Sequence, residues 1–131
     1  MKKKYPYLIV VLLLSGCATS QEQVERLSAQ ARLSDSVPVC DQDSCQRKWD
    51  AAQSWVSQNS AYKIQTVSSA IIDTYSPANG DMGLAFNVAK EPLSDGKYRI
   101  IIKAYCGNWI SCSEPPLKAA QRFNDYVNSV K

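Results

Sequence analysis

Hydrophobic residues are unevenly spaced along this chain of 131 residues, and their longest unbroken run lies near its start. Leu8 to Leu14 are all apolar, and the sequence turns polar soon after them. A helix that crosses a bilayer needs about 20 apolar residues, so this run is too short to span one. Beyond residue 39 apolar positions recur at regular intervals, which predicts the helices and strands of a folded domain.

The first periodic stretch, CQRKWDAAQSWVSQN from Cys45, predicts a helix capped by Asp43 or Ser44. One stripe of this helix is apolar and consists of Cys45, Trp49, Ala52 and Val56. Trp55 lies about 120° around the helix from Trp49 and broadens the apolar face. We interpret both tryptophans as core residues packed against a sheet, and an aromatic ligand box is the alternative.

Three strand-like runs follow this helix. The first lies within residues 62–75, where Ser68 and Ser69 interrupt a β-branched run and indicate a bulge. The second and third, Met82–Ala89 and Lys97–Cys106, alternate between two faces. One face of the third run carries Tyr98, Ile100, Ile102 and Ala104, and the other carries Arg99, Ile101, Lys103 and Tyr105. Asn79-Gly80 and the PLSDG stretch at 92–96 mark short turns, so neighbouring strands should be antiparallel.

A last helix is predicted after Ser113, with its apolar side formed by Leu117, Ala120, Phe123 and Val127. The order is therefore α-β-β-β-α, with both helices on the apolar face of the sheet. We expect an α+β fold, a two-layer α/β sandwich built on a three-stranded antiparallel meander. Residues 39–131 should form this single small domain.

The start of the chain carries a targeting signal. Lys2, Lys3 and Lys4 precede the apolar run, and the run ends in Leu14-Ser15-Gly16-Cys17. This layout is that of a secretory signal peptide, and its last four residues resemble the lipobox of bacterial lipoproteins. The resemblance implies that residues 1–16 are removed and that Cys17 carries the lipid. Ala18 directly after it implies, in a Gram-negative cell, sorting to the outer membrane with the domain in the periplasm.

Residues 17–38 would then be a lipidated flexible tether. The segment is polar, and a helix within it would show only a thin stripe of Val24, Leu27 and Ala31. An ordinary cleaved signal peptide with a chance cysteine is the alternative to lipidation.

Removal of the signal peptide changes the charge of the protein. The chain has 15 Lys and Arg against 12 Asp and Glu, and loss of the three early lysines leaves 12 of each. The basic residues of the mature chain are scattered among acids, apart from Arg47-Lys48. Binding to phosphate backbones requires clustered Lys and Arg, so we exclude a nucleic-acid partner.

Four cysteines remain after Cys17, and they are Cys40, Cys45, Cys106 and Cys112. An even number of cysteines in an exported chain favours two disulfides, and we favour the local pairs 40–45 and 106–112 over the longer-range pairings. The alternative is that these four cysteines bind zinc. The spacing between Cys106 and Cys112 is wider than that of paired cysteine ligands in zinc sites, and the chain has no histidine. We therefore expect no metal and no cofactor.

No catalytic constellation is visible in the sequence. The chain lacks histidine, a nucleophile elbow and a phosphate-binding glycine loop. Asp73 follows two isoleucines inside a strand-like run, and a solvent-facing place at the strand end explains it. We therefore expect a protein that is not an enzyme.

The best candidate for binding is the stretch between Cys106 and Cys112, which contains Asn108, Trp109 and Ile110. A disulfide there would present a tryptophan and an isoleucine on a stiff loop. Tryptophan often anchors protein interfaces, and a stiff loop loses little conformational entropy on binding. The alternative is that Trp109 folds back over the end of the sheet and completes the core. The half-covered strand face with Arg99, Ile101, Lys103 and Tyr105 is a second candidate surface.

These features predict an outer-membrane lipoprotein with a non-enzymatic interaction or assembly domain for an envelope protein. Its layout is similar to that of pilotins of secretion systems, although residues 39–131 contain no motif of that family. The alternative is a module that binds a small ligand or an envelope polymer in a pocket between helices and sheet.

Overall fold

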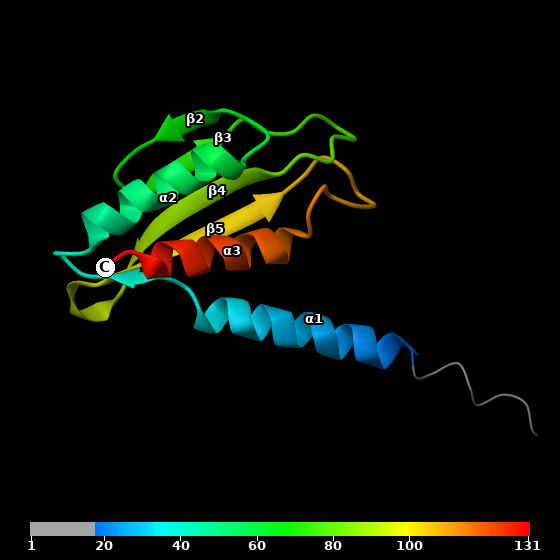
Figure 1. Cartoon of the computed structure of the whole chain (residues 1–131), viewed down its shortest axis with the longest axis horizontal. Coiled ribbons are helices and arrows are strands. Elements are labelled where there is room, and N and C mark those ends of the chain that lie inside the picture. The colour runs from blue at the N-terminus through cyan, green and yellow to red at the C-terminus, as the bar shows by residue number, and fades with distance from the viewer. Residues whose placement is uncertain (1–17) are drawn as a thin grey trace, which may run out of the picture.

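A computed structural model describes residues 18–131 of the chain as three helices beside an antiparallel sheet of five strands (Figure 1). The predicted signal peptide and Cys17 lie outside the described residues. In chain order the elements are α1 (Ala18–Asp35), β1 (Val39–Cys40), α2 (Cys45–Asn59), β2 (Ile64–Val67), β3 (Ile71–Thr74), β4 (Ala85–Pro92), the 3₁₀ turn η1 (Ser94–Gly96), β5 (Tyr98–Tyr105) and α3 (Pro116–Ser129). Within this part of the chain, no helix has the length and apolar character needed to cross a membrane.

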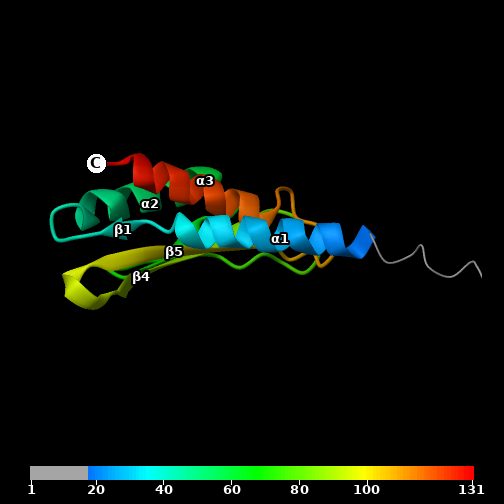
Figure 2. The same ribbon diagram turned by 90° about the horizontal axis from the view of Figure 1, so that it is seen from below.

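The sheet has the strand order β1-β5-β4-β3-β2, α2 and α3 lie along one of its faces, and α1 packs against α3 (Figure 2). Phe86 and Ile100 of the sheet are fully buried under Val56 of α2 and Phe123 of α3. The ring of Trp55 meets Phe86 and Phe123 edge-on, at centroid distances of 5.2 and 5.4 Å. This arrangement confirms the predicted two-layer α+β sandwich.

Both tryptophans of α2 belong to the core. Trp49 and Trp55 are 4% and 5% exposed, and the indole nitrogen of Trp49 donates a hydrogen bond of 3.0 Å to the carbonyl of Ser68. The predicted apolar stripe of this helix is buried along its whole length. The aromatic-box alternative is therefore wrong.

The sheet has more strands than the predicted meander. The run at 62–75 is a hairpin of β2 and β3 rather than one bulged strand, because Ser68 turns the chain. The hydroxyl of Ser68 accepts hydrogen bonds from the backbone N–H groups of Ala70 and Ile71, at 3.2 and 3.0 Å. Serine favours such local turns over a continuous ladder. The fifth strand, β1, pairs Val39 with Arg99 and is too short to leave a periodic pattern.

Residues 18–35 form helix α1, where the sequence predicted a flexible tether. The segment has no Gly or Pro and is rich in Ala, Gln, Glu, Arg and Leu, which all favour a helix. Glu22 and Arg26 add an ion pair one turn apart. The end of α1 is held by Asn124 of α3, whose amide donates to the carbonyl of Leu33 and the hydroxyl of Ser36 at 3.2 and 3.1 Å.

Candidate interaction site: a disulfide-closed loop and an uncovered sheet face

The four domain cysteines form the two local pairs that the sequence favoured, Cys40–Cys45 and Cys106–Cys112. The first pair joins β1 to the first residue of α2. The second pair closes residues 106–112, which follow β5 directly and which we call the contact loop. The Cα atoms of Cys106 and Cys112 are 5.8 Å apart, so the ends of the loop are held together.

The contact loop is fixed to the neighbouring connection between β3 and β4. The carbonyl of Gly107 accepts a hydrogen bond of 2.9 Å from the backbone N–H of Gly80, and Ser113 donates one of 2.7 Å to Met82. The backbones approach so closely at Gly107 that a Cβ there would lie 1.9 Å from the carbonyl oxygen of Ala78. Only glycine fits this position, a requirement that is invisible in the sequence because residues 78 and 107 belong to different loops.

Asn108 shapes the contact loop from within. Its side-chain oxygen accepts hydrogen bonds of 2.9 and 3.0 Å from the backbone N–H groups of Ile110 and Ser111. Its amide nitrogen donates to the carbonyl of Gly80 at 3.2 Å. Of the three predicted contact residues, Asn108 therefore stabilises the conformation of the loop.

Trp109 and Ile110 face the solvent, with 89% and 75% of their surfaces exposed. The alternative that Trp109 folds back to complete the core is wrong. The sheet end is already filled by Leu84 and Phe86, which are 4% and 0% exposed. The contact loop therefore presents an aromatic and an aliphatic side chain that the described domain does not bury.

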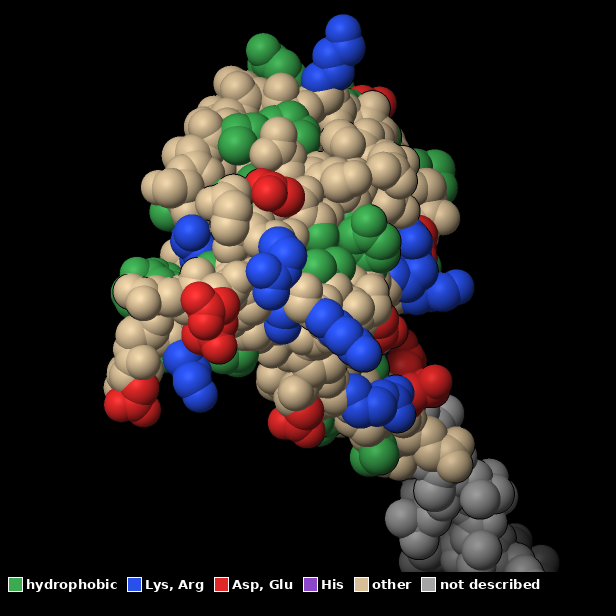
Figure 3. Space-filling model, turned by 60° about the vertical axis from the view of Figure 1, so that its left-hand side comes forward, with side chains coloured by type: hydrophobic (Ala, Val, Ile, Leu, Met, Phe, Trp, Pro, Cys, Tyr) green, Lys and Arg blue, Asp and Glu red, His purple; other side chains and the backbone are tan. Residues whose placement is uncertain are grey.

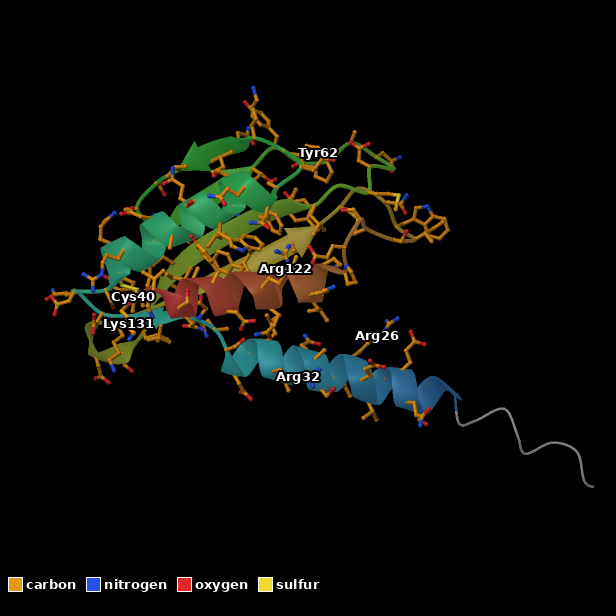
Figure 4. All side chains as sticks on the ribbon, viewed as in Figure 1. Arg26, Arg32, Cys40, Tyr62, Arg122 and Lys131 are labelled. Carbon is orange, nitrogen blue, oxygen red and sulfur yellow. A yellow bond between two sulfur atoms is a disulfide. The ribbon has the colours of Figure 1, made fainter. Side chains whose placement is uncertain are left out.

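Other apolar side chains lie exposed at the same end of the sheet. Tyr75 follows β3 and Met82 precedes β4, and they are 53% and 47% exposed. Tyr62, also at this end (Figure 4), donates a hydrogen bond of 3.0 Å from its hydroxyl to Asp81. Desolvation and the bond to this carboxylate raise the pKa of Tyr62, so the phenol stays neutral and remains a donor.

The sheet face away from the helices forms the second candidate site, which we call the open face. From β5 it carries the four residues predicted for it, Arg99, Ile101, Lys103 and Tyr105. Arg99 donates two hydrogen bonds, of 3.0 and 2.8 Å, to one carboxylate oxygen of Glu91 on β4. Asp73 lies on this face as expected and accepts a hydrogen bond from Asn87 at 3.3 Å.

A metal site requires several acidic, cysteine or histidine side chains that lie close together. Residues 18–131 contain no group of three Asp, Glu, Cys or His able to hold a metal ion. Two grooves border α1, of about 530 Å³ beside β5 and about 610 Å³ beside α3, and both open to the surface. Leu33 and Ile101 lie in the first groove, and Glu22 and Pro115 in the second.

Comparison of the chain with models of protein families, with curated protein sequences and with solved structures found no match.

Proposed function

We propose that this chain is an outer-membrane lipoprotein, anchored through acyl chains on Cys17, with a periplasmic domain that binds an envelope protein without catalysing a reaction. The lipobox-like Leu14-Ser15-Gly16-Cys17 supports the anchor. Two or more acyl chains hold a protein stably at a bilayer, so a separate membrane-spanning helix is not needed.

The observation that carries a contact role for the domain, with a protein or with the membrane, is the exposure of Trp109 at 89% on a loop closed by a disulfide. Tryptophan is enriched among the residues that dominate binding energy. A loop that is already rigid loses little conformational entropy when its side chains are buried by a partner. The contact loop therefore has the properties of a preformed contact site.

The open face is a second contact surface, and it is the one we assign to the envelope protein. It combines the half-buried Ile101 with Tyr105, which is 36% exposed, and with the charged Lys103 and Arg99. Such a mixture of apolar and charged groups is typical of transient protein interfaces. An assembly domain needs contacts on two sides, and the two surfaces supply them.

The alternative role, binding of a small ligand or an envelope polymer, has less support. The space between helices and sheet is filled by Trp55, Phe86 and Phe123. Ligand pockets normally enclose most of the ligand surface, whereas both grooves along α1 are open.

Anchoring is tested with Cys17→Ser. The wild-type chain should fractionate with membranes and float with them, and the variant should be released in a soluble form. A Cys17→Ser protein that stays with the membranes at its native size would overturn the anchor.

The protein partner is tested by site-specific photo-crosslinking in cells. A benzophenone side chain at position 103 on the open face should give one adduct of defined mass. The same group at the exposed position 53 on α2 is the control and should not give that adduct. No adduct from position 103, or identical adducts from both positions, would contradict the assignment of the open face.

A further inference from the structure

We propose that the contact loop inserts into the membrane: Trp109 and Ile110 enter the interfacial layer of the bilayer leaflet that holds the acyl chains of Cys17. This inference rests on the proposed function, because the lipid on Cys17 is what brings the domain to that leaflet. It leaves the open face for the protein partner.

The direction of α1 places the contact loop on the membrane side of the domain. The end of α1 is bonded to Asn124 and Asn128 in the second half of α3, whereas Glu22 near its start lines a groove with Pro115 at the start of α3. α1 and α3 are therefore antiparallel. Figures 1 and 2 both show the start of α1 at the same end of the molecule as the connection from β5 to α3, which contains the contact loop.

The contact loop and the start of α1 lie at a similar level along the molecule (Figure 1). Glu22 and Pro115 line the same groove, so only the first turn of α1, roughly 6 Å of helix, continues past this groove toward Cys17. The contact loop precedes Pro115 and extends in the same direction. A bilayer surface at Cys17 therefore lies within reach of Trp109.

The exposed residues at this end are those that bilayer interfaces favour. Tryptophan and tyrosine are enriched at the headgroup level, where an aromatic ring is partly buried in an apolar layer. Trp109, Ile110, Tyr75 and Met82 are all about half exposed or more. The view that brings the opposite end of the molecule forward shows charges of both signs between small apolar groups (Figure 3).

One nearby carboxylate, that of Glu114, is paired with a cation and so opposes this contact less than a free charge would, whereas Asp81 is bonded to a neutral phenol and keeps its charge. Glu114 accepts hydrogen bonds of 2.9 and 2.8 Å from Arg122, and Asp81 accepts the bond from Tyr62. The loop also needs no rearrangement, because its disulfide and the hydrogen bonds of Asn108 already hold Trp109 outward.

The test uses the full-length, acylated protein in vesicles of phosphatidylethanolamine and phosphatidylglycerol, with part of the lipid brominated along its acyl chains. Bromine quenches only tryptophans that enter the bilayer. Trp49 and Trp55 are buried in the domain, so the quenched fraction should come from Trp109 and should fall at least two-fold in Trp109→Phe. Ile110→Ser, a second exposed change, should weaken the quenching of Trp109.

The matched control moves the reporter to the opposite end. Tyr98 is 36% exposed at the start of β5, so Tyr98→Trp in the Trp109→Phe background should be quenched by aqueous acrylamide and not by brominated lipid. Circular dichroism should show that each variant retains the fold.

The outcomes separate the two proposals. If the protein floats with the vesicles and Trp109 is not quenched by brominated lipid, the insertion proposal is overturned and the anchor stands. If a benzophenone at position 109 forms its adduct with a protein in native membranes, insertion is likewise overturned. If the wild-type protein does not float with the vesicles, the anchor fails and the insertion proposal falls with it.

Discussion

At the scale of single residues, Gly107 determines where the contact loop lies. A Cβ at this position would overlap the carbonyl of Ala78, and backbone atoms cannot move aside as a flexible side chain can. We expect Gly107→Ala to lower the free energy of unfolding by about 1–3 kcal/mol, the usual cost of overpacking. The measurement is urea denaturation monitored by fluorescence.

The control for this change is Gly96→Ala. Gly96 has a φ of 70° and no atom near its Cβ position, so alanine there should cost about 1 kcal/mol for the left-handed backbone alone. Equal stability of Gly107→Ala and the wild type would show that the two loops are not in contact.

Glu114 gives a prediction for the dependence of stability on pH. The hydrogen bonds from Arg122 hold the pKa of Glu114 below its ordinary value of 4.5. A depressed pKa in the folded state contributes stability above the unfolded pKa, and this contribution is lost as the pH falls through the folded pKa. Because Arg122 is 44% exposed, the pair should contribute only about 0.2–1 kcal/mol.

The measurement compares urea midpoints of the wild type and Glu114→Gln between pH about 7 and about 3. The wild type should be more stable at neutral pH, and the difference should shrink below pH 4.5. A difference that stays constant over this range would mean that the Glu114 carboxylate is not stabilised by Arg122.

At the scale of elements, one buried amide is among the α3 side chains that attach α1, beside Gln121 and Asn128. Asn124 is 1% exposed and joins α3 to the last turn of α1 through Leu33 and Ser36. We expect Asn124→Ala to lower stability by about 1–3 kcal/mol, because it removes two partly buried hydrogen bonds between α3 and the end of α1. Hydrogen exchange should rise throughout α1 and stay unchanged in α2.

Tyr126→Ala is the matched control for this variant. Tyr126 lies on the same helix but is 43% exposed, so its removal should leave the exchange of α1 as in the wild type. Unchanged exchange of α1 in Asn124→Ala would contradict the proposed attachment, and with it the fixed direction of α1 on which membrane insertion depends.

The elements that were predictable from the sequence are those whose apolar positions repeat. α2, α3, β4 and β5 each bury one periodic face, and the two short disulfides agree with the even number and the spacing of the four domain cysteines. The remaining features depend on pairs that are far apart in the chain. Ser36 is hydrogen-bonded to Asn124, and Gly80 to Gly107. No local sequence pattern predicts either contact.

The candidate site was predictable to a similar extent. Two cysteines around a tryptophan indicated the contact loop, but whether Trp109 faces inward or outward depends on how completely other residues fill the sheet end. The roles of Asn108 and Gly107 depend on the backbone of the adjacent loop. The helical state of residues 18–35 depends on propensity and on docking to α3, which a thin apolar stripe does not indicate.

At the scale of the whole molecule, charge and shape assign different roles to different surfaces. Without the predicted signal peptide the chain carries 12 basic and 12 acidic side chains, so long-range attraction to an anionic bilayer would contribute little. The acyl chains on Cys17 would hold the protein at the membrane, and the contact loop would set its orientation. With that end held, the proposed arrangement would leave the open face accessible to a protein in the periplasm.

This division of roles predicts that orientation is insensitive to salt. Raising NaCl from about 0.1 to about 1 M shortens the Debye length from about 10 to about 3 Å and removes most attraction between exposed charges. Burial of Trp109 and Ile110 is apolar and should persist, so the quenching of Trp109 by brominated lipid should stay within experimental error of its low-salt value. Loss of Trp109 quenching at high salt would show that charged groups, rather than the apolar tip of the contact loop, hold the domain against the bilayer.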